Sequence, residues 1–87
     1  MFTGIITHLG RFERNEDNHY FFSTPADFLD KAILGSSISV NGACLTVEKK
    51  DKNIFSAYLM PETLSRTMFN TLSESQSVNL ELPMTAG

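Results

Sequence analysis

The chain has 87 residues, 41% of them hydrophobic, and a formal net charge of −3 at pH 7. This composition is typical of one small folded domain and argues against intrinsic disorder. The acidic balance disfavours nucleic acid and anionic membranes as partners, and no apolar run approaches the ~20 residues that a membrane-spanning helix needs.

The first quarter of the chain predicts a pair of strands. Apolar and polar residues alternate over residues 4–14, which indicates a strand, and the polar residues 15–18 indicate a turn. The segment 19–22 is short and rich in aromatic side chains, which favours a second strand paired with the first.

A short helix is predicted next. A hydroxyl side chain followed by Pro25 is typical of a helix start, with the hydroxyl as N-cap. Apolar side chains at helical spacing indicate two to three turns, and Gly35 provides the C-terminal stop. These apolar residues are Phe28, Leu29, Ala32 and Ile33.

The strongest local signal is a hairpin over residues 36–47, where Asn41 and Gly42 join two alternating runs. Both residues adopt positive φ at low cost, so the chain can reverse within two residues. Cys44 and Thr46 follow on the second strand, and the period of two points both side chains to one face. A thiol and a hydroxyl side by side next to a tight turn indicate the wall of a small-molecule site.

The remaining residues predict two more strands and a second helical turn. A polar turn over 51–53 precedes a strand over 54–59, Pro61 opens the helical turn, and residues 77–82 alternate as the last strand. In total the chain predicts a compact all-β antiparallel barrel of about six short strands with one or two short helices, as a single domain over residues 1–87.

The single cysteine cannot form an internal disulfide, and the N terminus lacks the features of a secretory signal. We therefore expect a cytoplasmic protein. His8 and His19 have no companion ligands close to them in sequence, which disfavours a metal site.

Four motifs resemble the N-terminal half of riboflavin synthase, in the same order and with similar gaps. They are Met1-Phe2-Thr3-Gly4-Ile5, Asn41-Gly42-Ala43-Cys44-Leu45-Thr46-Val47, Met60-Pro61-Glu62-Thr63-Leu64 with Thr67, and Val78-Asn79-Leu80-Glu81. The resemblance implies a six-stranded antiparallel Greek-key β-barrel, one of two similar barrels in the family's polypeptide, with the second barrel beyond Gly87. It also implies self-association, with a dimer for the isolated domain and a trimer for the parent.

The resemblance implies an activity as well. The family transfers a four-carbon unit between two molecules of 6,7-dimethyl-8-ribityllumazine, which yields riboflavin and 5-amino-6-ribitylaminopyrimidinedione without a cofactor or metal. The family's site lies between barrels of two subunits, so an isolated barrel is expected to bind lumazine or riboflavin and to turn over poorly. Two alternatives stay open: a non-catalytic lumazine- or flavin-binding protein of the same fold, and a module that serves self-association only.

By the same resemblance, three segments line the lumazine pocket, and Cys44 and Thr46 are the candidate catalytic residues. The pocket residues are Gly4, Ile5, Ile6, Cys44, Leu45, Thr46, Tyr58, Leu59, Met60, Pro61, Glu62 and Thr63. Glu62 and Thr63 are placed to bond ribityl hydroxyls, with Ser37 and Ser39 as weaker candidates for the same tail.

Structural explanations stand beside these roles. Thr46 is also an ordinary β-branched strand residue, and Glu62 also complements a helix dipole. A lone cysteine such as Cys44 is more often a small buried hydrophobic residue than a functional thiol.

Overall fold

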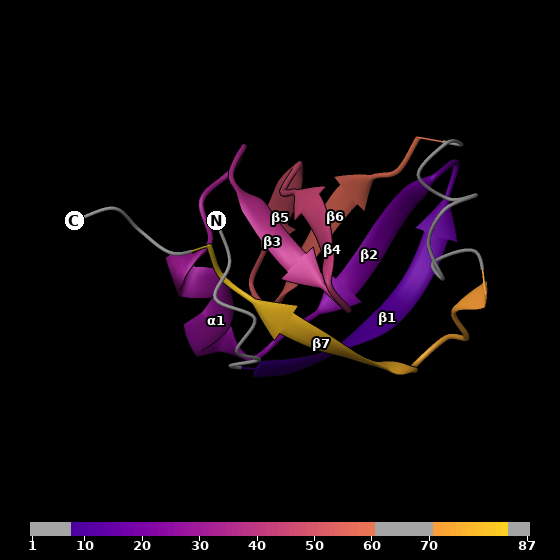
Figure 1. The fold of residues 1–87 in the computed structure, drawn as a ribbon, viewed down its shortest axis with the longest axis horizontal. Coiled ribbons are helices and arrows are strands. Elements are labelled where there is room, and N and C mark those ends of the chain that lie inside the picture. The colour runs from indigo at the N-terminus through magenta and orange to yellow at the C-terminus, as the bar shows by residue number, and fades with distance from the viewer. Residues whose placement is uncertain (1–7, 61–70, 84–87) are drawn as a thin grey trace.

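The computed structural model describes residues 8–60 and 71–83, which Figure 1 draws in colour. These residues form seven strands and one helix: β1 (His8–Glu16), β2 (His19–Ser23), α1 (Ala26–Lys31), β3 (Ser37–Val40), β4 (Ala43–Thr46), β5 (Lys49–Asp51), β6 (Ile54–Tyr58) and β7 (Ser77–Glu81). The beginning of the predicted first strand and the helical turn predicted at Pro61 lie outside the described residues. Within the described ranges, no helix has the length and apolar character needed to cross a membrane.

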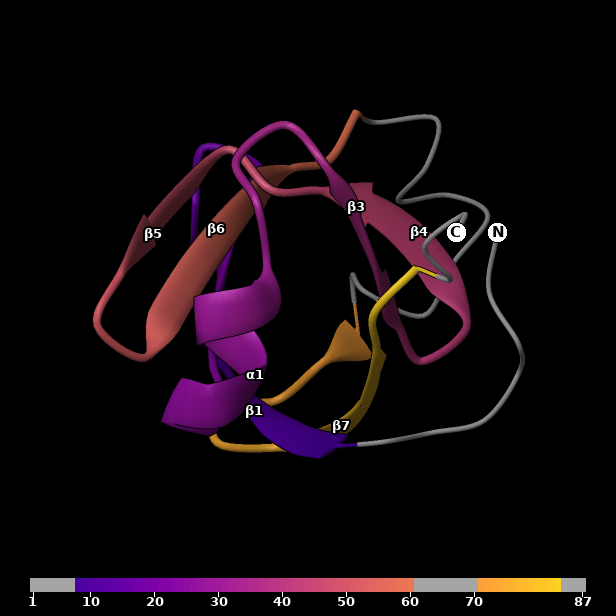
Figure 2. The same ribbon diagram turned by 90° about the vertical axis from the view of Figure 1, so that its left-hand side faces the viewer.

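All seven strands belong to one antiparallel sheet with the order β4-β3-β7-β1-β2-β6-β5. β4 and β5 stand at opposite ends of this order, yet only two residues separate them in the chain. The sheet therefore curls round, as Figure 2 shows, and residues of β4 contact residues of β6. Long connections bring β6 beside β2 and β7 between β1 and β3, which is Greek-key connectivity. The prediction of an all-β Greek-key barrel is confirmed.

The prediction placed no strand at residues 49–51, where β5 lies. Lys49 pairs with Ser56 of β6, and the N–H of Glu48 donates to the carbonyl of the same Ser56 at 2.9 Å. Where two residues of one strand face a single residue of its neighbour, they form a β-bulge, which bends the strand. β4 and β5 are therefore one strand bent at residues 47–48, and counted in this way the barrel has the six strands that were predicted.

The core fills the inside of the curled sheet. Its centre includes Phe22 and Phe55, whose rings stack with centroids 5.3 Å apart. The core residues are Phe12, Tyr20, Phe22, Phe28, Leu29, Ala32, Ile38, Val40, Leu45, Val47, Phe55, Ala57, Leu59, Val78 and Leu80. Alternation along each strand places the polar side chains mainly on the outer face, where a ligand can reach them.

The helix α1 is shorter than predicted and begins differently. Its N-cap is Pro25, without a side-chain hydrogen bond, and the preceding hydroxyl of Thr24 donates to the Pro25 carbonyl instead of capping. The helix ends at Lys31, so Ile33 lies beyond it and is exposed, which corrects its predicted place in the apolar pattern of the helix. The ammonium group of Lys50 donates to the carbonyl of Ala32 at 2.6 Å and ties the end of α1 to β5.

Candidate functional site

The predicted hairpin is present between β3 and β4. Asn41 and Gly42 form its turn with φ angles of 50° and 85°. Cys44 and Thr46 are both exposed, whereas the side chain of Leu45 between them is buried in the core. The predicted shared face of the thiol and the hydroxyl is therefore confirmed, and the alternative of a buried Cys44 is wrong. Leu45 can reach a ligand on this face only through its backbone.

The end of β6, which begins the next predicted segment, lies beside β4. The two strands are in contact but are not neighbours in the hydrogen-bonded order of the sheet. Glu48 lies opposite Ser56 at the bulge, and extending this register by two residues along both strands sets Thr46 opposite Tyr58. The curl of the barrel thus brings together two segments that are separate in sequence.

Burial agrees with this alignment over the next residues. Tyr58 and Met60 are 49% and 60% exposed and face outward like Cys44 and Thr46. Leu59, between Tyr58 and Met60, is buried in the same way as Leu45. The described members of two predicted pocket segments therefore present their polar and flexible side chains on one outer surface. Gly4, Ile5, Ile6, Pro61, Glu62 and Thr63 lie outside the described residues, and their place in the pocket stays a prediction.

The same outer surface continues onto β3 and β7. Ser37 pairs with Thr46 and Ser39 with Cys44, and Ser39 also pairs with Glu81 on β7. Ser39 and Glu81 are both buried although they lie on the outer side of the sheet. In the sequence, Glu81 stands out only as part of a motif. The pairing of β7 with β3, together with strand alternation, places Glu81 in the same row as Ser39 and Cys44.

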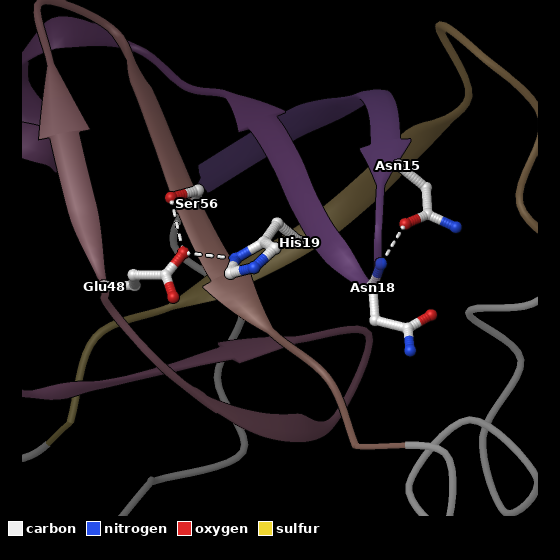
Figure 3. A network of polar contacts seen from close by, with 5 residues as sticks. All are labelled: Asn15, Asn18, His19, Glu48 and Ser56. Atoms are coloured by element: carbon white, nitrogen blue, oxygen red, sulfur yellow. Dashed lines mark hydrogen bonds and ion pairs between the residues drawn. The ribbon is translucent and has the colours of Figure 1, made fainter.

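Beside these residues, a polar network joins β2, the bulge at Glu48 and β6 (Figure 3). The Nδ1 atom of His19 is 2.8 Å from Oε1 of Glu48, and the hydroxyl of Ser56 donates to the same oxygen at 3.3 Å. The His19 ring packs on Tyr58 with 5.1 Å between centroids. Sequence reasoning missed this network because its members come from three separate segments.

The cavities lined by described residues lie elsewhere. Two have a volume of about 410 Å³ each, and none of the predicted pocket residues lines either of them. The more apolar cavity borders the polar network through Glu48 and Ser56 and has Phe21, Leu34 and Ile54 among its walls. Half of the predicted pocket residues lie outside the described ranges, so these cavities do not mark that pocket.

Comparison with known proteins shows the family to which this fold and this surface belong. Residues 3–83 match the model of the lumazine binding domain. The riboflavin synthase of Bacillus subtilis is 40% identical over 89 residues, which cover 99% of this chain and 41% of that protein. The riboflavin synthase of Photobacterium phosphoreum is 44% identical over 88 residues, covering 97% of this chain and 40% of that protein.

A solved structure is similar over the whole chain. The crystal structure of LumP complexed with riboflavin matches with a TM-score of 0.79 and 26% sequence identity, over 100% of this chain and 51% of that one. The chain thus spans about two fifths of the length of the curated relatives it matches. With four motifs in order, a matching fold and a family model over nearly all its residues, the chain belongs to the family of lumazine-binding domains.

Proposed function

We propose that this chain is the N-terminal lumazine-binding barrel of a riboflavin synthase. It binds 6,7-dimethyl-8-ribityllumazine and riboflavin on the outer surface where β4 meets the end of β6. The observation that carries this proposal is the shared outward face of Cys44, Thr46, Tyr58 and Met60 in a member of the lumazine-binding family. Similarity to riboflavin synthases over almost the whole chain supports it.

The edge of β4 suits the flat ring of such a ligand. In the described part of the chain β4 pairs only with β3, so its other edge is not part of a strand ladder. Backbone N–H and C=O groups on such an edge are ready donors and acceptors. A pyrimidine ring carries carbonyl and N–H groups along one edge and can form hydrogen bonds with the backbone groups that β4 leaves unpaired beside the end of β6. The hydroxyl of Thr46 both donates and accepts and adds a side-chain contact.

The parent protein carries out the dismutation of two lumazine molecules. One molecule loses a four-carbon unit and the other gains it, so no external oxidant or reductant is needed. Much of the rate enhancement comes from holding two rings in the correct relative orientation and from stabilising the anion formed when a 7-methyl group loses its proton. We assign Cys44 and Thr46 to the ring, and Glu62 and Thr63 to the ribityl hydroxyls. The parent works in the cytoplasm and self-associates as a trimer, whereas the isolated barrel forms a dimer.

A second candidate function is flavin binding without catalysis. The similarity to LumP, which was solved with riboflavin, favours this candidate. Identities of 40% and 44% to riboflavin synthases, against 26% to LumP, favour the enzyme. Incubation of the full-length parent with 6,7-dimethyl-8-ribityllumazine separates the two, because only the enzyme forms riboflavin.

Titration of riboflavin with the chain tests binding directly. We expect its fluorescence to change as it binds, and an unchanged signal at high micromolar protein would overturn the proposed function. Thr46→Val keeps the volume and removes one hydroxyl, so we expect an increase in Kd of about fivefold with little loss of stability. Ser77→Ala removes a hydroxyl from an exposed position on β7 and serves as the control. An unchanged Kd in Thr46→Val would remove Thr46 from the site.

A further inference from the structure

The carboxylate of Glu48 holds the imidazole of His19 in one orientation. Nδ1 of His19 contacts Oε1 of Glu48 at 2.8 Å, and the hydroxyl of Ser56 donates to that same oxygen from the neighbouring strand (Figure 3). The His19 and Glu48 side chains are 40% and 30% exposed, so solvent screens their contact only in part. Because Glu48 sits in the bulge between β4 and β5, the imidazole is tied to the strand that carries Thr46.

The oriented imidazole packs on Tyr58. The two rings have centroids 5.1 Å apart and an interplanar angle of 54°, which is a favourable tilted arrangement for aromatic groups. His19 and Tyr58 are also directly paired across β2 and β6. A half-exposed tyrosine has several rotamers open to it, and a ring packed against one side restricts them.

Tyr58 lies on β6, between His19 of β2 and the strand that carries Thr46. His19 pairs with Tyr58 from the β2 side of β6, and the register extended from Glu48 and Ser56 sets Thr46 on the other side of that strand. We infer that His19, held by Glu48, is a positioning residue that fixes the Tyr58 ring as a wall of the flavin site beside Thr46. The inference rests on the proposed function. A fixed aromatic wall next to a hydroxyl suits a flat heterocycle with a polar edge, because it adds ring contact at little entropic cost.

The chain contains a second histidine that contacts a carboxylate and packs on an aromatic ring, as His19 does with Glu48 and Tyr58. This second trio supplies a matched control. At the beginning of β1, Nε2 of His8 is 3.0 Å from Oδ2 of Asp27 and the His8 ring lies 5.0 Å from that of Phe28. The hydrogen bond from His8 lowers the pKa of Asp27 below its usual range. This trio joins β1 to α1 and includes no residue of the proposed site, so its loss reports on stability alone.

Riboflavin titration of the whole chain by fluorescence tests the inference. His19→Gln keeps an amide donor for Glu48 and removes the ring, and we expect Kd to rise about fivefold, the size of one aromatic contact. Tyr58→Leu should give a similar rise. The double variant should bind no more weakly than Tyr58→Leu alone, because His19 acts through Tyr58. His8→Gln should lower the melting temperature and leave Kd unchanged.

The outcomes are distinct. Additive losses in the double variant, or an unchanged Kd in His19→Gln while the wild type binds riboflavin, would overturn the positioning role and leave the proposed function standing. A wild-type chain that does not bind riboflavin would overturn the proposed function itself. If His19→Gln does not fold, Glu48→Gln carries the same test with the ring retained. The neutral amide forms a weaker hydrogen bond, so we expect Kd to rise about twofold, and no change would count against the inference.

Discussion

Gly10 shows how tightly the strands of this barrel are packed. A Cβ atom at this position would lie 2.6 Å from the carbonyl oxygen of Ser23 and 2.7 Å from Cδ1 of Leu80. The side chain of Leu80 can rotate away, but the carbonyl belongs to the backbone of β2. Relief would therefore require the two strands to separate. The alternating pattern of the first strand gives no indication of this constraint, because it arises from two strands that meet β1 from different parts of the chain.

We expect Gly10→Ala to lower the free energy of unfolding by about 2 kcal/mol through this overpacking. Urea denaturation followed by circular dichroism measures the loss. Ser77→Ala, which changes an exposed residue on the neighbouring strand β7, should leave the midpoint unchanged. A wild-type midpoint for Gly10→Ala would show that the backbone moves to accommodate a methyl group.

At the level of elements, the turn between β3 and β4 reverses the chain and also binds the neighbouring strand β7. The Oδ1 atom of Asn41 accepts a hydrogen bond from the N–H of Asn79 at 2.7 Å, and the N–H of Asn41 donates to the carbonyl of Asn79 at 2.8 Å. Positive φ alone explained Asn41 in the sequence. The structure adds that its side chain joins the hairpin carrying Cys44 and Thr46 to β7.

Two substitutions at Asn41 separate these two tasks. Asn41→Gly retains easy access to positive φ but leaves the N–H of Asn79 without its side-chain acceptor, and we expect a loss of about 1 kcal/mol in unfolding free energy. Asn41→Asp keeps an acceptor oxygen and tolerates the same backbone conformation, so it should retain most of the stability. Urea denaturation of both variants provides the measurement. Equal midpoints for the two would show that the turn conformation is all that matters.

The predictable elements are those whose signal is contained in a few consecutive residues. The Asn-Gly turn, the alternation around Cys44 and the last strand are of this kind, and the structure agrees with each. β5 has three exposed residues and no apolar alternation, and it is a strand only because the curl of the sheet brings it beside β6. The contact between His19 and Glu48 spans 29 positions of sequence and depends on the same curl.

For the whole molecule, the curl of the sheet into a barrel is what produces the proposed site. The bend at residues 47–48 sends one strand from its pairing with β3 to its pairing with β6. On the β4 side of the bend, β4 and β6 are in contact without a hydrogen-bonded ladder. The outward residues of these two strands form the proposed ligand surface. Among the described strands, the bend that curls the sheet therefore also leaves one edge of β4 without a ladder, where a ligand can bind.

One surface of this kind holds one flat ring, whereas the proposed reaction needs two rings in opposed orientation. We therefore expect the 87-residue chain to bind lumazine but to form riboflavin far more slowly than a full-length synthase, because most of the catalytic advantage lies in holding both reactants. Fluorescence titration measures the binding, and chromatographic detection of riboflavin after incubation with lumazine measures turnover. The riboflavin synthase of Bacillus subtilis, a full-length relative, is the positive control. Turnover by the chain at the rate of that enzyme would show that two copies of this barrel assemble the complete site by themselves.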